Sequence, residues 1–162
     1  MHNDLVVMTF DSEADALKAR GGLEIMRNSQ MLGVMDTVMV TRDRAGELIV
    51  HQQSALPTQP PSLGIQMPRM LANAFFAEQR EERVQPLVDA GLDERFVAEV
   101  SSALVPGSSM LLNYVRRDSL VDTQRLLGTL RQFKGTLYHT TVPEEVEEAI
   151  LKQSEHEQAL TR

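Results

Sequence analysis

AGLDERFVAEVSSALVPGSSMLLNYV, residues 90–115, is the stretch of this sequence that decides the fold. Asp93 can cap a helix by accepting from backbone N–H groups two or three residues on. The apolar residues after it recur at four-residue spacing, as one helical face requires: Phe96, Val100 and Leu104. Pro106 cannot donate the amide of a further turn and Gly107 can adopt a positive φ, so the helix is expected to stop near Leu104. Residues 110–115, MLLNYV, then predict an interior strand.

The composition narrows the class of protein. The chain has 162 residues, 42% of them hydrophobic, which is enough for a single domain over 1–162 with a sizeable core. It has no cysteine, which excludes disulfides and thiolate metal sites and fits a reducing, cytoplasmic location. The net charge of −7 argues against nucleic acid as a partner, because phosphate binding needs clustered Lys and Arg. The N-terminus lacks a signal-peptide pattern, and its apolar run is too short to cross a bilayer.

The N-terminal part of the chain predicts a strand followed by a helix. Residues 4–10 suit a central strand, because four successive apolar positions favour cover on both faces. Ser12 can cap a helix ending near Asn28, in which Leu17, Gly21 and Ile25 repeat at four-residue spacing. The pair Gly21-Gly22 costs about 1 kcal/mol per glycine relative to alanine. It indicates a kink, an early helix end or close packing against the sheet, and close packing is favoured.

The middle of the chain predicts a hairpin and then an insertion. Two β-prone runs flank residues 43–46, where Gly46 can take the left-handed conformation, and they bring together four apolar residues: Val38, Val40, Leu48 and Val50. Residues 54–68 hold four of the seven prolines and predict an extended linker. An amphipathic helix is expected over 69–88, so 54–88 forms an insertion within the domain.

The C-terminal part predicts helix, strand and helix. An amphipathic helix that Gly135 ends is lined by Leu120, Leu126, Leu127, Leu130 and Phe133. Residues 136–142 predict a strand with Leu137, His139 and Thr141 on one side and Tyr138 and Thr140 on the other. Pro143 opens a last helix, which buries Val146 and Ile150.

This order of elements predicts an α+β sandwich. Right-handed crossovers place the main helices on one side of the sheet, and the doubly apolar first strand then needs cover on the other side as well. The helix after Pro68, the C-terminal helix or a second copy of the chain could supply that cover.

Four stretches carry a family resemblance: LVVMTFDSEADA near the N-terminus, RDRAGEL in the hairpin, GTLYHTTVPEEVEEAI near the C-terminus and, above all, GLDERFVAEVSSALVPGSSMLL. The motif residues of the last are Gly91, Asp93, Phe96, Glu99, Leu104, Pro106, Gly107 and Ser109. In these stretches the chain resembles the bacterial domain-of-unknown-function family 1269, often labelled as predicted membrane proteins. The resemblance implies a ferredoxin-like unit with a mainly antiparallel sheet of about five strands, and no catalytic residues. Prolines and a charged helix replace the family's glycine-rich apolar hairpin, so a soluble variant without a transmembrane segment is predicted.

The candidate site residues are few. The histidines are His2, His51, His139 and His156, and none has a partner at the i+4 spacing of a helical metal pair. His51 and His139 could bind a metal or a porphyrin if they lay on adjacent strands facing the same side, but ordinary strand positions are the main interpretation. Carboxylate pairs such as Glu81-Glu82 are interpreted as solvated, and the nine methionines as core packing.

Two hypotheses of function follow. The leading one is a non-enzymatic, homo-oligomeric protein without a cofactor, which acts through contacts with an unknown protein partner in a stress-related or envelope-associated assembly. The alternative is a ferredoxin-like dimer that binds a small ligand in a pocket between sheet and helices, near Tyr114, Tyr138, His139 and His51.

Overall fold

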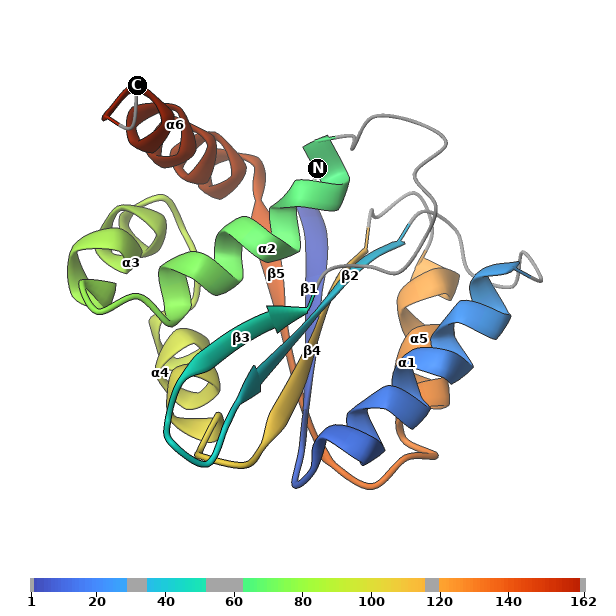
Figure 1. Ribbon diagram of the computed structural model, residues 1–162. Helices are drawn as coiled ribbons and strands as arrows, with labels where there is room; N and C mark the ends of the chain where they lie inside the picture. The colour runs from blue at the N-terminus through green and yellow to red at the C-terminus, as the bar shows by residue number, and fades with distance from the viewer. Residues whose placement is uncertain (1, 29–34, 52–62, 116–119, 161–162) are drawn as a thin grey trace.

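The computed structural model describes residues 2–28, 35–51, 63–115 and 120–160, which form a mixed set of helices and strands (Figure 1). In chain order these are β1 (His2–Phe10), α1 (Glu13–Asn28), β2 (Met35–Arg42), β3 (Leu48–His51), α2 (Leu63–Phe75), α3 (Arg80–Asp89), α4 (Glu94–Ala103), β4 (Ser109–Val115), α5 (Leu120–Leu130), β5 (Thr136–Pro143) and α6 (Glu144–Leu160). None of the helices in these ranges combines the length and the apolar character needed to cross a membrane.

The strands form one antiparallel sheet in the order β3-β2-β4-β1-β5. Without β3, the order β2-β4-β1-β5 and the crossover helices α1 and α5 give the ferredoxin-like arrangement, in which β4 enters between β1 and β2. The short strand β3 adds an edge beyond β2. The predicted α+β, ferredoxin-like sandwich with five strands is confirmed.

The central strand β1 is buried on both faces, as its apolar run predicts. Leu5 and Val7 belong to a core cluster on one face of the sheet, while Val6 and Met8 belong to a second cluster on the other face. All four are at most 1% exposed. Because successive strand residues point to opposite faces, such a run is stable only when both faces are covered.

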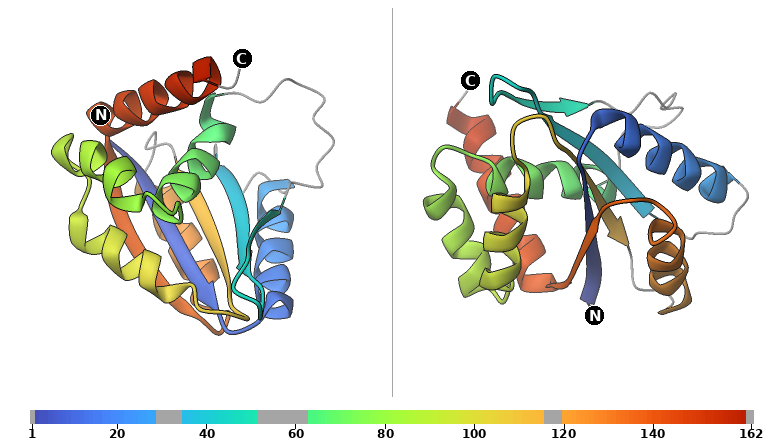
Figure 2. Two further views of the ribbon diagram at one scale, coloured as in Figure 1. Left: turned by 60° about the vertical axis from the view of Figure 1, so that its left-hand side comes forward. Right: turned by 90° about the horizontal axis from the view of Figure 1, so that it is seen from below.

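The chain itself supplies both layers of cover. Helices α1 and α5 lie on one face of the sheet, and α2, α3, α4 and α6 lie on the other (Figure 2). Two of the three expected sources of cover, the helix after Pro68 and the C-terminal helix, therefore fill the second face. In the C-terminal helix Val146 and Ile150 are buried, as predicted.

The stretch that decides the fold forms the expected helix and strand. The Asp93 carboxylate accepts from the backbone N–H of Arg95 at 3.0 Å and of Phe96 at 3.4 Å, which caps α4. The helix ends at Ala103, and Gly107 takes a φ of 85° in the turn before β4. Every residue of β4 is buried, which confirms the interior strand. The β2–β3 hairpin also forms as predicted, and Gly46 has a φ of 89°.

The insertion differs from the prediction. Residues 54–62 lie outside the described residues, whereas 63–68, predicted to be linker, are helical, with Pro68 inside α2. The single helix expected over 69–88 is two helices, α2 and α3. The last buried residue of α2 is Phe75, and the next buried residue is Val84 in α3. The helix is therefore interrupted at the exposed, mostly charged residues between them.

Helix α1 presents a different side to the sheet from the one its spacing suggests. Its buried residues are Ala16, Ala19 and Leu23, whereas Leu17 is 42% and Ile25 69% exposed. The predicted close packing occurs at Gly22, but against Phe133 beyond the end of α5: a β-carbon there would lie 2.9 Å from the Phe133 Cζ. A β-carbon at Gly21 would meet nothing within 4 Å.

Two glycines should respond in opposite directions to replacement by alanine. A β-carbon at Gly135 would lie 2.3 Å from the Thr9 carbonyl oxygen, so Gly135→Ala should lower the free energy of unfolding by about 1–3 kcal/mol. The matched control, Gly128→Ala in α5, has open space and should raise it by up to about 1 kcal/mol. Urea denaturation with unchanged m-values measures both. Equal stability of Gly135→Ala and the unsubstituted protein would contradict the close approach of Gly135 to β1.

Candidate functional site

A group of polar side chains joins α6 to the sheet on the face that carries α2. The Tyr114 hydroxyl donates to the Glu147 carboxylate, and the Asn3 side-chain amide donates to both Glu147 and the Tyr114 hydroxyl, the latter at 3.1 Å. Tyr114 is 2% exposed, and its partner in strand register, Asp36, is 4% exposed. Tyr114 therefore anchors α6 through its hydroxyl while its ring lies in the core.

A second polar group lies on the opposite face, against α5. The Asp4 carboxylate is almost fully buried and accepts from the Thr123 hydroxyl at 2.9 Å. Its other oxygen lies 3.2 Å from the His139 Nε2, and the His139 side chain is 41% exposed. A buried carboxylate thus holds one nitrogen of a histidine whose ring reaches the surface, which fixes the orientation of that ring.

His51 makes its contacts at the far edge of the sheet. Its Nε2 is hydrogen-bonded to the Thr41 hydroxyl at 2.8 Å and lies 3.9 Å from the Glu13 carboxylate of α1. Thr41 is in turn hydrogen-bonded to the buried Ser109 hydroxyl at 2.9 Å. His51 therefore links the edge strand to α1.

The four predicted ligand-binding residues do not share one pocket. Tyr114 and Tyr138 belong to the core of the α2 face, whereas His139 contacts Asp4 on the α5 face. His51 and His139 lie on β3 and β5, the two opposite edges of the sheet, so the adjacency that a shared metal or porphyrin would need is not met. Within the described ranges, no group of three or more His, Asp or Glu side chains could hold a metal ion.

Only Tyr138 and His139 come together, at a hollow along the free edge of β5. The hollow has a volume of about 310 Å³ and is also lined by residues in the first half and the middle of α4, among them Arg95 and Glu99. Arg95 and Glu99 form an ion pair at 3.2 Å on the exposed side of that helix. The lining is therefore mostly polar and charged.

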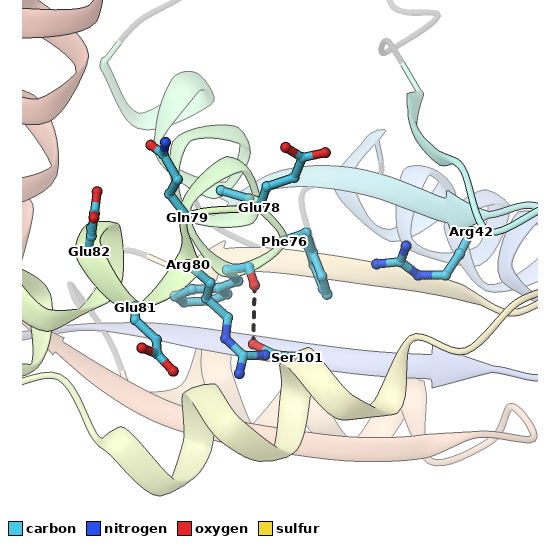
Figure 3. Close-up of a pocket in the computed structure, with 10 residues that line it drawn as sticks. Arg42, Phe76, Glu78, Gln79, Arg80, Glu81, Glu82 and Ser101 are labelled. Atoms are coloured by element: carbon cyan, nitrogen blue, oxygen red, sulfur yellow. Dashed lines mark hydrogen bonds between the residues drawn. The ribbon is translucent and has the colours of Figure 1, made fainter.

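A larger hollow of about 470 Å³ lies between the α2–α3 turn, α4 and the end of β2 (Figure 3). In Figure 3 the Arg42 side chain extends toward the Phe76 ring, and the Ser101 hydroxyl donates to the Phe75 carbonyl at 3.2 Å. Arg42 donates from Nε to the Leu104 carbonyl at 3.0 Å and from Nη1 to the Gly46 carbonyl at 2.8 Å. These bonds tie the hairpin loop to the end of α4, so Arg42 has a structural task at this hollow.

The family-motif residues take structural positions. Gly91 has a φ of 121° beside Pro143, Asp93 caps α4, and the Phe96 ring packs edge to face on Phe75 with centroids 6.5 Å apart. Pro106 and Gly107 form the turn that leads into β4, where Ser109 is buried. Searches against protein-family models, curated proteins and solved structures find no match to this chain, so the resemblance stays a prediction.

Sequence reasoning missed the partners of the candidate residues. Asp4, Asn3, Thr123 and Glu147 lie far from them in sequence, and no local pattern connects them. One signal was present: Asp4 directly precedes an apolar run that predicts a buried strand, and a buried carboxylate requires hydrogen-bond partners. Among the described residues, every buried side-chain nitrogen or oxygen does have one.

Removal of the Tyr114 hydroxyl should cost stability because it leaves two half-buried partners, Asn3 and Glu147, with fewer hydrogen bonds. Tyr114→Phe is expected to lower the free energy of unfolding by about 1–2 kcal/mol without changing the secondary structure. Chemical denaturation monitored by circular dichroism measures the loss, and Tyr138→Phe, on the partly exposed edge strand, is the comparison. A loss no larger for Tyr114→Phe than for Tyr138→Phe would refute the anchoring of α6 by Tyr114.

Proposed function

We propose that this chain is a non-enzymatic protein that acts through protein–protein contacts and associates with copies of itself. One observation carries the proposal: large apolar side chains stand exposed on α1 and on the neighbouring edge strand. Leu17 is 42% exposed, Ile25 69% and Ile49 43%. Single exposed apolar residues are ordinary on protein surfaces, but a group of them on adjoining elements is typical of an interaction site.

The contacts of β3 support the view that these residues belong to one surface. Leu48 and Val50 pack against the core of the α2 face, so Ile49 between them points to the face that carries α1. His51, which points the same way as Ile49, lies 3.9 Å from Glu13 in the first turn of α1. We call Leu17, Ile25 and Ile49 the α1–β3 surface.

The arrangement of polar residues supports a non-enzymatic role. The groups around Tyr114 and Asp4 are hydrogen-bonded inside the chain and join helices to the sheet. The hydrogen bonds of these polar groups contribute to the stability of the fold. Folding gives no comparable reason for the exposure of the apolar residues of the α1–β3 surface.

The oligomeric state tests the proposal directly. Light scattering coupled to gel filtration at micromolar concentration should give a mass of at least two chains. The double variant Leu17→Ser with Ile25→Ser should have the mass of one chain, because the two substitutions remove the apolar contact. Val105→Ser is the matched control, because Val105 is 53% exposed on the loop after α4 and should leave the mass unchanged. A one-chain mass for the unsubstituted protein would rule out self-association.

A second candidate function, the binding of a small polar ligand, is favoured by the hollow that Tyr138 and His139 line together. Native mass spectrometry of the purified protein should then detect a noncovalent adduct. His139→Ala should lose the adduct, and His51→Ala, at the opposite edge of the sheet, should retain it. Absence of any adduct, or its loss in both variants, would count against this site.

A further inference from the structure

The half-buried side chain of Arg42 carries a charge that the described part of the chain leaves unpaired. Its Nε and Nη1 donate to the carbonyls of Leu104 and Gly46, which are neutral acceptors. No carboxylate in the described ranges lies within ion-pair distance of the guanidinium, and its Nη2 group has no partner there. Removal of a charge from water is costly unless an opposite charge compensates for it. An anion bound at Nη2 would supply that compensation.

The Arg42 guanidinium lines the hollow of about 470 Å³ between the α2–α3 turn, α4 and the end of β2. A second arginine, Arg80, reaches this hollow from the opposite side (Figure 3). Arg80 is exposed and makes no hydrogen bond or ion pair with any residue that the structure describes. Two guanidinium groups without an anionic partner therefore face one space, and its volume is sufficient for a small molecule.

The wall between the two arginines is aromatic and held in place. The Phe76 ring is half-buried against the core of the α2 face and stands between Arg42 and Arg80 in the view of Figure 3. The Ser101 hydroxyl donates to the Phe75 carbonyl at 3.2 Å, which ties α4 to the end of α2. An apolar ring between two cationic groups suits a ligand that combines a planar apolar part with an anionic group.

Three glutamates also line this hollow, but they do not fill the space between the arginines. Glu78 and Glu82 point away from that space, and Glu81 lies beyond Arg80 on the side away from Arg42 (Figure 3). Glu81 and Glu82 belong to the first turn of α3, where the helix dipole stabilises carboxylates. In the same turn the cation of Arg80 is unfavourable for the helix. The fold therefore explains the glutamates and leaves Arg80 without a structural reason.

We propose that this hollow binds a small organic anion, whose carboxylate or phosphate group lies between Arg42 and Arg80 and whose planar apolar part lies on Phe76. The two carbonyl bonds of Arg42 hold its guanidinium in place, so little freedom is lost when Nη2 donates to the anion. A guanidinium can donate two parallel N–H bonds to a carboxylate or to a phosphate, so the site admits both. This site is separate from the hollow of Tyr138 and His139 and does not depend on self-association.

Titrations followed by NMR of the isotope-labelled full chain test the site. Sodium benzoate, phenyl phosphate or both should shift the amide signals of residues 76–82 and 101 saturably at millimolar concentration, because each carries a ring and an oxyanion. Benzyl alcohol has the ring without the charge, so its dissociation constant should be at least about tenfold higher. The anion with the lower dissociation constant identifies whether the site prefers a carboxylate or a phosphate.

Arg80→Gln is the main test variant, because it removes one guanidinium without breaking a hydrogen bond within the described ranges. It should raise the dissociation constant of the bound anion by about tenfold or more. Arg95→Gln removes the same charge from an exposed position of α4 outside this hollow, so it is the matched control and should leave the constant unchanged. Unchanged amide signals away from the substituted residue verify that each variant is folded.

A loss of affinity confined to Arg80→Gln, together with weak binding of benzyl alcohol, supports the anion site. Three results overturn it. Binding of benzyl alcohol as tight as that of the anions would mean that the hollow offers apolar contact alone. Equal losses in Arg80→Gln and Arg95→Gln would mean a general effect of net charge. The absence of a saturable shift with either anion, or shifts confined to other parts of the chain, would mean that no anion binds in this hollow.

Discussion

Burial of β1 on both of its faces is the constraint on which the rest of the structure depends. Leu5 and Val7 need one apolar layer and Val6 and Met8 need another, and a ferredoxin-like unit alone supplies helices for one face only. The three helices between β3 and β4, namely α2, α3 and α4, together with α6, provide the second layer. What distinguishes this chain from the simple arrangement is therefore also what stabilises its central strand.

Most of the fold could be predicted because its signals are local. The cap at Asp93, the turn at Gly107 and the alternation of side chains along β5 each depend on a few adjacent residues. The insertion could not be predicted in the same way. Pro68 suggests a helix boundary, but the helix continues through it because Met67 and Leu71 are buried in the core, and the break after Phe75 depends on which residues the sheet can cover.

The candidate sites were less predictable because they depend on tertiary contacts. Alternation correctly separates Tyr138 from His139, but only the strand order reveals that His51 lies at the opposite edge from His139. In α1, four-residue spacing of Leu17, Gly21 and Ile25 suggests a buried stripe, yet the sheet receives Ala16, Ala19 and Leu23. Small alanines allow the helix to approach the sheet closely, and this preference outweighs the larger apolar area of the other side.

The position of β4 has a consequence for how the chain reaches this structure during synthesis. The Asn113 side-chain amide of β4 donates a hydrogen bond to the Val6 carbonyl of β1, 107 positions earlier in the chain. On its other side, β4 pairs with β2. A nascent chain therefore carries β1 and β2 as two separate strands until the strand between them leaves the ribosome. Entry of β4 closes the middle of the sheet, and β5 then adds to the margin beside β1. Topologies of this kind, dominated by distant pairings, fold slowly.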